Sequence, residues 1–99
     1  MNTKRETNVI EKINIELPGK YNVIFFNDDI TPMGFVVEIL VNIFSFDRAQ
    51  AVEVMLKIHQ NGKSVVGTYI KSIAESKVTL VRDVALKADY PLNVTIEKA

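Results

Sequence analysis

Two segments of the sequence carry polar side chains that are suited to binding a ligand. Asn27-Asp28-Asp29 directly follows an apolar run of strand length, and His59, the only histidine, stands near the end of a predicted helix. An amide carbonyl, a carboxylate and a neutral imidazole can together accept the three hydrogen bonds of an alkylammonium group. If the two segments meet in the fold, we expect a site for R–NH₃⁺ with an apolar cavity for the R group.

Other interpretations of these residues remain open. A divalent metal ion is the rival ligand, although one histidine and two carboxylates without a cysteine would bind it weakly. Asn and Asp are also ordinary turn formers, and a histidine at a helix C-terminus is favoured by the helix dipole. Gly62-Lys63-Ser64 resembles the end of a phosphate-binding loop, but Lys57 stands where that motif needs its first glycine. The residues therefore offer little support for an enzyme.

Composition excludes several classes of function. The 99 residues contain 12 Lys and Arg against 12 Asp and Glu, which argues against binding to nucleic acid or to an anionic membrane. The longest uncharged apolar run, from Ile39 to Phe46, is too short for the roughly 20 residues of a membrane span. The absence of cysteine excludes disulfides and zinc–thiolate sites. The mixed charges of the first twenty residues do not fit a signal or transit peptide. We expect a cytoplasmic, monomeric domain without a metal or other cofactor.

The hydrophobic pattern predicts three strands and three helices in the order β-α-α-β-α-β, an α+β domain. Runs rich in β-branched and aromatic residues cover the three strands, at 21–26, 64–70 and 92–96. Helical spacing of apolar residues fills 32–44, the segment between Asp47 and Gly62, and about 71–89. Residues 1–19 are expected to form an extended or disordered tail, in which Ile13, Ile15 and Leu17 alternate as in a short edge strand.

Residue types typical of helix ends support these boundaries. Thr31 is predicted to cap the first helix, with Pro32 at its first position. Asp47 and Gln50 have capping-box spacing, and Gly62 suits the end of the second helix. The spacing also predicts the core-facing residues, which are 33, 36, 37, 40, 43 and 44 in the first helix, Ala51, Val52, Met55, Leu56, Ile58 and His59 in the second, and Ile73, Ala74, Val78, Val81, Val84 and Ala85 in the third.

Four stretches of the chain closely resemble the ClpS adaptor family. They are Tyr-Asn-Val-Ile-Phe-Phe-Asn-Asp-Asp-Ile-Thr-Pro-Met at 21–33, Met-Leu-Lys-Ile-His-Gln-Asn-Gly-Lys at 55–63, Ala-Glu-Ser-Lys at 74–77 and Pro-Leu at 91–92. The resemblance runs in register over residues 20–99, which we take as the adaptor core domain. It implies a three-stranded antiparallel sheet packed on three helices and a function that is not enzymatic.

The resemblance also implies what the domain binds. Members of this family bind substrate proteins through a bulky hydrophobic N-terminal residue, the N-degron, which is Leu, Phe, Tyr or Trp with a free α-amino group. They deliver these proteins to a ClpA- or ClpC-type AAA+ unfoldase, which feeds the ClpP protease. The tail is thought to engage the translocation machinery of the unfoldase.

Family roles transfer onto individual residues of this chain. The resemblance implies that the α-amino group is bound by Asn27, Asp28, Asp29 and His59. It implies a side-chain pocket walled by Phe25, Thr31, Met33, Val36, Met55, Ile58 and Leu92, with Met33 as a gate against β-branched residues. It places the unfoldase contact on the helix that holds Glu75 and Lys77.

Two alternatives from other functional classes are kept. One is a small metal-dependent hydrolase that uses Asp28, Asp29 and His59. The other is a pure protein-interaction domain of the same fold, in which the acidic turn is only a turn and no N-degron pocket exists.

Overall fold

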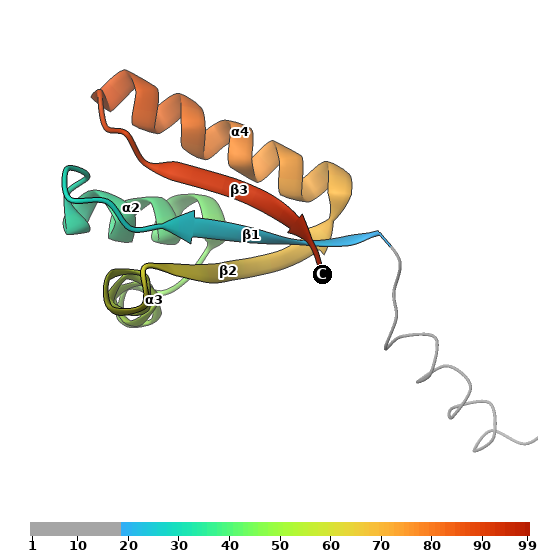
Figure 1. The fold of residues 1–99 in the computed structure, drawn as a ribbon, viewed down its shortest axis with the longest axis horizontal. Coiled ribbons are helices and arrows are strands. Elements are labelled where there is room, and N and C mark those ends of the chain that lie inside the picture. The colour runs from blue at the N-terminus through green and yellow to red at the C-terminus, as the bar shows by residue number, and fades with distance from the viewer. Residues whose placement is uncertain (1–18) are drawn as a thin grey trace, which may run out of the picture.

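The helices and strands follow the predicted order β-α-α-β-α-β (Figure 1). The computed structural model describes residues 19–99. Its elements are β1 (Lys20–Phe26), α2 (Met33–Phe44), α3 (Arg48–Asn61), β2 (Lys63–Ile70), α4 (Lys71–Ala88) and β3 (Asn93–Lys98). The predicted α+β fold is confirmed. The expected tail and the possible strand at 13–17 lie outside the described residues, apart from Gly19.

The sheet is antiparallel with the strand order β2-β1-β3, so β1 lies in the middle. At the end of β1, Phe26 pairs with Lys63 at the start of β2 and with Asn93 at the start of β3. The loop after β1, the end of α3 and the loop before β3 are therefore gathered at one end of the sheet (Figure 1). This end brings together segments that are far apart in the sequence.

The core lies between the sheet and two helices. Val23 and Phe25 are fully buried alternate residues of the central strand, and they join buried residues of α2 and α4 in one cluster. The rings of Phe25 and Phe44 meet edge to face with their centroids 5.6 Å apart. α3 packs against α2 and against the edge strand β2. At the opposite edge, the Arg82 guanidinium of α4 donates a hydrogen bond to the Val94 carbonyl of β3 at 2.8 Å.

The predicted ends of α3 are confirmed. The Asp47 carboxylate accepts a hydrogen bond from the Gln50 amide at 2.8 Å, and the Gln50 side chain accepts one from the Asp47 amide at 3.3 Å. Gly62 ends the helix with a φ of +85°, a left-handed conformation that costs glycine little. The position of this last turn matters for the site described below.

The predicted start of α2 is wrong by one residue. Pro32, rather than Thr31, is the N-cap residue, and the helix begins at Met33. The Thr31 hydroxyl donates to the Asp28 carboxylate at 2.8 Å, so it serves the preceding loop instead of capping the helix. The Pro32 carbonyl accepts the first helical hydrogen bonds, from Phe35 and Val36.

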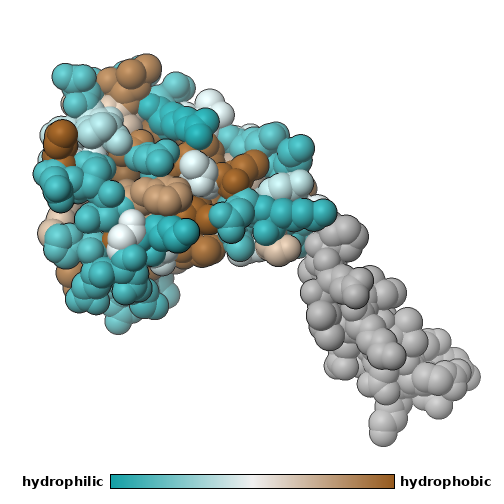
Figure 2. Space-filling model, viewed as in Figure 1, coloured by the Kyte–Doolittle hydropathy of each residue, from teal (hydrophilic) through white to brown (hydrophobic). Residues whose placement is uncertain are grey.

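Several residues that were predicted to face the core are exposed. Ile73 and Val84 of α4 are 44% and 40% exposed, and Val52 and Leu56 of α3 are 37% and 40% exposed. The sheet and α2 cover only a narrow stripe of α4, formed by Ala74, Val78, Val81 and Ala85. Residues at the margin of a stripe therefore stay in contact with solvent. Figure 2 shows such hydrophobic patches scattered among hydrophilic residues on one face. Within residues 19–99, no helix is long and apolar enough to cross a membrane.

Gly34, in the first turn of α2, offers a test of this helix start. A Cβ at Gly34 would meet no heavy atom within 4 Å. Gly34→Ala should therefore raise the free energy of unfolding by about 0.5–1 kcal/mol, because alanine loses less backbone entropy in a helix. Thermal denaturation measures this change, which corresponds to a rise of up to about 8 °C in Tm. Gly62→Ala, at a left-handed position, should instead lower stability by about 1–2 kcal/mol. A lower Tm for Gly34→Ala would contradict the described start of α2.

Candidate functional site

A cavity of about 270 Å³ lies at the end of the sheet where the loops gather. The loop after β1, the first turns of α2 and the last turns of α3 form most of its wall. The lining residues are Phe26, Asn27, Asp28, Asp29, Ile30, Thr31, Pro32, Met33, Val36, Met55, Ile58, His59 and Leu92. All four residues predicted to bind the amino group, and six of the seven predicted pocket residues, thus share one cavity.

The lining is divided between a buried apolar part and an exposed polar part. Val36, Ile58 and Leu92 are each less than 10% exposed and form the apolar floor. Asn27, Asp29 and His59 are exposed and stand at the rim. Met55 is half-buried, and Met33 is 45% exposed near the opening. The cavity therefore suits a ligand with an apolar body and a polar end.

One backbone hydrogen bond joins the acidic loop to the helix that carries the histidine. The Asn27 amide donates to the Gly62 carbonyl at 2.8 Å. Gly62 also closes the last turn of α3, since its amide donates to the Ile58 carbonyl at 2.9 Å. His59 lies within this turn, so the bond brings the imidazole and the acidic loop to the same cavity. The juxtaposition on which the sequence argument depended is therefore present.

Asp28 shapes the loop. One of its carboxylate oxygens accepts hydrogen bonds from the backbone amides of Ile30 at 2.8 Å and Thr31 at 2.6 Å, and the other accepts from the Thr31 hydroxyl. Partial burial favours the protonated acid, but the hydrogen bonds from Thr31 and Ile30 outweigh this effect and lower the pKa of Asp28. Asp28 is thus a loop-forming carboxylate that also adds negative charge to the cavity.

The side chains of Asn27, Asp29 and His59 are differently placed. Among residues 19–99, no hydrogen bond engages any of these three side chains. Their acceptor atoms therefore remain able to bind a ligand at the rim. The acidic triplet thus divides into one carboxylate that builds the loop and one that is exposed beside the cavity.

Phe25 is the one predicted pocket residue that the structure places elsewhere. Its side chain is fully buried in the core against Phe44 and does not line the cavity. The next residue, Phe26, lines it instead. Successive side chains of a strand point to opposite faces, so a strand that buries Val23 and Phe25 must turn Phe26 away from the core. This alternation was the sequence signal for Phe26. The lining residues Ile30 and Pro32 were also missed.

The two residues predicted to contact the unfoldase lie on α4, outside the cavity. Glu75 is exposed, but Lys77 is half-buried. The Lys77 ammonium donates to the Ile43 carbonyl at 2.8 Å and lies 5.4 Å from the ring centroids of both Phe44 and Tyr69. Lys77 therefore binds the last turn of α2 to α4, which is a structural role that the sequence did not indicate.

A metal centre has little geometric support in the described part of the chain. Residues 19–99 contain no group of three or more His, Asp or Glu side chains arranged to hold a metal ion. Asp28 is engaged within its own loop. The remaining pair of Asp29 and His59 offers fewer ligands than a zinc or calcium site ordinarily uses.

Comparisons with known proteins agree with the fold and the site. The family described as "ATP-dependent Clp protease adaptor protein ClpS" matches residues 16–95. The ATP-dependent Clp protease adapter protein ClpS of Vibrio atlanticus is 47% identical over 88 residues, which are 89% of this chain and 83% of the relative. The protein of the same name from Vibrio cholerae is 44% identical over 89 residues, covering 90% of this chain and 84% of the relative.

A solved structure is also similar. Agrobacterium tumefaciens ClpS2 bound to L-phenylalaninamide has a TM-score of 0.80 and 34% sequence identity, covering 83% of this chain and 99% of that protein. Together these matches define an adaptor protein of the Clp protease, not an enzyme, which excludes the hydrolase alternative. The chain belongs to the ClpS family.

The role of Asp28 in the loop predicts a pH-dependent loss of stability. Asp28→Ala removes the hydrogen bonds to Ile30 and Thr31 and should lower the free energy of unfolding by about 1–2 kcal/mol near neutral pH. Denaturant titration of both proteins measures the difference.

The sign of the pH effect follows from the lowered pKa of Asp28. Folding lowers that pKa below its ordinary value of 3.8, so the unfolded chain binds the proton more readily in acid. The stability that Asp28 contributes is complete above that value and is lost as the pH falls through the lower, folded-state pKa. The difference between wild type and Asp28→Ala should therefore shrink between about pH 6 and about pH 2. A difference that stays constant over this range would contradict the described hydrogen bonds.

Proposed function

We propose that this adaptor binds proteins that begin with Leu, Phe or Tyr, with Trp as the largest candidate, and requires a free α-amino group. It then delivers them to a ClpA- or ClpC-type AAA+ unfoldase for degradation by ClpP. The observation that carries the proposal is the single cavity that combines an apolar floor with polar acceptors at its rim. The bound L-phenylalaninamide of the Agrobacterium relative supports it, because that molecule joins an α-amino group to one aromatic side chain.

The rim matches the requirements of an α-ammonium group. Asn27 and Asp29 can each contribute a side-chain oxygen, and His59 can contribute a ring nitrogen when it is neutral. Asp28 contributes charge rather than a direct bond, because its oxygens are already used within the loop. An acetylated terminus carries no positive charge and has only one N–H. It would desolvate Asp29 without providing a cation, which costs about 2–5 kcal/mol.

The size of the cavity matches one large side chain. A cavity of roughly 150 Å³ is enough to hold benzene, and this cavity measures about 270 Å³. Met33 lies beside the opening, where a second substituent on the Cβ of the first residue would crowd it. We therefore infer that Ile and Val are disfavoured as first residues.

The expected affinity suits an adaptor that must release its cargo. Burying one Leu or Phe side chain contributes about 1.5–3 kcal/mol. Each of three hydrogen bonds to a charged group contributes about 1.5–3 kcal/mol. Subtracting at least about 4 kcal/mol for association leaves no more than about 8 kcal/mol. This free energy corresponds to a dissociation constant no tighter than about micromolar.

Peptide binding tests the proposal directly. A fluorescent peptide that begins with Phe should bind at least tenfold more tightly than its N-acetylated counterpart, and at least tenfold more tightly than the same peptide beginning with Ile. Fluorescence anisotropy measures the three dissociation constants. Equal binding of all three peptides would rule out the proposed pocket.

Alanine variants connect the binding to the rim. Asn27→Ala, Asp29→Ala and His59→Ala should each weaken binding of the Phe peptide by about tenfold or more. Gln60→Ala is the matched control for His59→Ala, because Gln60 is exposed on the same turn but does not line the cavity. If the three rim variants bind as wild type does, the domain is a protein-interaction module without an N-degron site.

The contrast between Glu75 and Lys77 generates a prediction about unfoldase docking. Glu75 is exposed, so Glu75→Lys should weaken binding to a ClpA- or ClpC-type unfoldase by about two- to fivefold without lowering the Tm. Lys77→Met should lower the free energy of unfolding by about 1–3 kcal/mol, because the bond to the Ile43 carbonyl is lost. Thermal melts and binding titrations with the purified unfoldase separate the two effects.

Glu53→Lys on the exposed side of α3 is the matched control for charge reversal. It should leave unfoldase binding unchanged, since it lies on a different helix from Glu75. Equal loss of binding in Glu53→Lys and Glu75→Lys would show a general charge effect and would contradict a docking role for Glu75.

A further inference from the structure

We propose that Phe26 makes the cavity prefer an aromatic first residue over an aliphatic one of similar size. The inference rests on the proposed function and specifies the class of side chain that the cavity binds best. It concerns a residue that the sequence did not indicate, since Phe25 rather than Phe26 was expected in the wall.

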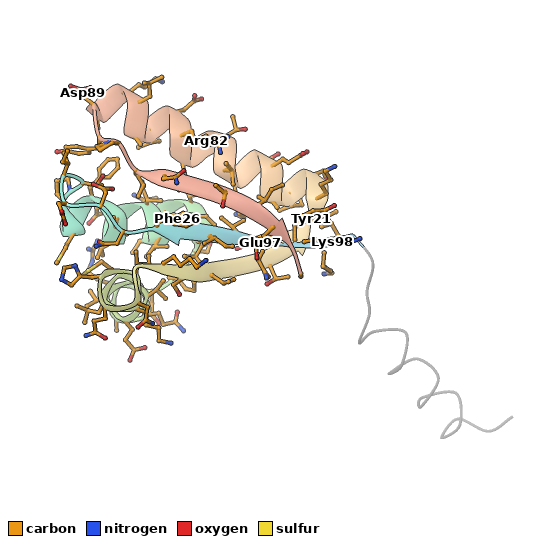
Figure 3. All side chains as sticks on the ribbon, in the orientation of Figure 1. Tyr21, Phe26, Arg82, Asp89, Glu97 and Lys98 are labelled. Carbon is orange, nitrogen blue, oxygen red and sulfur yellow. The ribbon has the colours of Figure 1, made fainter. Side chains whose placement is uncertain are left out.

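Phe26 belongs to the cavity rather than to the core. It is the last residue of β1 and lies at the end of the strand opposite to Tyr21 (Figure 3). Its side chain is half-buried, lines the cavity and directly precedes Asn27 of the rim. Unlike Tyr21, it is not among the half-buried residues packed against the core cluster. A side chain that binds in the cavity therefore shares a wall with the Phe26 ring.

The backbone around Phe26 is fixed on both sides. Phe26 pairs with Lys63 of β2 and with Asn93 of β3, and the following amide bonds to the Gly62 carbonyl at 2.8 Å. The Lys63 ammonium lies 5.8 Å from the centroid of the Phe26 ring, which places a cation at one face of the ring. The ring is therefore held in place before any ligand binds.

The Phe26 ring also lacks an aromatic neighbour within the described residues. The ring pairs found there join Phe25 to Phe44, Phe35 to Tyr90 and Phe44 to Tyr69. A ligand ring in the cavity would supply such a neighbour to Phe26. An edge-to-face arrangement like that of Phe25 and Phe44 is the expected geometry.

The rest of the lining favours the same class of side chain. Met33 and Met55 provide two thioethers at the cavity, and sulfur–aromatic contacts are favourable. A Leu side chain gains the burial but neither the ring pair nor the sulfur–aromatic contact. The ring pair alone corresponds to a preference of about two- to tenfold for an aromatic residue.

The test compares peptides that differ only in the first residue. Phe, cyclohexylalanine and Leu are placed at the start of one sequence, so that Phe and cyclohexylalanine differ mainly in the π system. Wild type should bind the Phe peptide about two- to tenfold more tightly than the cyclohexylalanine and Leu peptides. In Phe26→Leu this preference should fall toward the part that Met33 and Met55 supply, while the Leu peptide still binds.

Phe35→Leu is the matched control, because Phe35 is also a half-buried phenylalanine but does not line this cavity. It should keep the wild-type preference even if its Tm falls. Two outcomes overturn the inference: wild type binds the Phe and cyclohexylalanine peptides equally, or Phe26→Leu keeps the full preference. The first outcome is read on wild type alone and does not depend on how well the variant folds.

The N-acetylated Phe peptide distinguishes failure of this inference from failure of the proposed function. If peptides with a free amine bind and the acetylated one does not, the N-degron site stands and only the ring preference is decided by the comparison above. If no peptide binds, both proposals fail.

Discussion

The binding cavity depends on the hydrogen bond between the Asn27 amide and the Gly62 carbonyl. Asn27 begins the loop after the central strand, and Gly62 ends the helix that carries His59. The bond requires that α3 end where β2 begins, and the left-handed Gly62 makes this turn possible. Without it, a cluster of acceptors would be divided between two separate surface segments. The fold therefore creates the site by joining the ends of two elements rather than by shaping a single loop.

Two neighbouring aspartates have different tasks in this arrangement. Asp28 accepts three hydrogen bonds and gives the loop its shape, whereas the Asp29 side chain stays exposed at the rim. A binding site for a cation needs a carboxylate whose oxygens are not already satisfied, and it needs a rigid backbone to hold that carboxylate in place. The same residue cannot readily do both. The pair Asp28-Asp29 divides the requirements between adjacent positions, and Thr31 supports the first of them instead of capping its own helix.

Much of the fold could be predicted because local signals and packing agree. The capping box of Asp47 and Gln50, the glycine at position 62 and the strand pattern of β1 all specify structure within a few residues. The meeting of the acidic loop with His59 was inferred only as a condition, since it depends on the register of a sheet that a linear pattern does not fix. The error at Phe25 has the same origin. A continuous apolar run does not show which alternate residues face the helices, although Phe26 follows once Val23 and Phe25 are known to be buried.

The central strand also separates the cavity from the start of α4. Phe26 at one end of β1 borders the cavity, while Lys20 at the other end pairs with Ile70, the residue before α4. At about 3.3 Å per residue, the strand keeps these two ends on the order of 20 Å apart. Cargo at the cavity and a larger partner on the first turns of α4 therefore do not compete for the same surface. A small domain of this shape can form a ternary complex, in which one bound molecule need not leave before the other arrives.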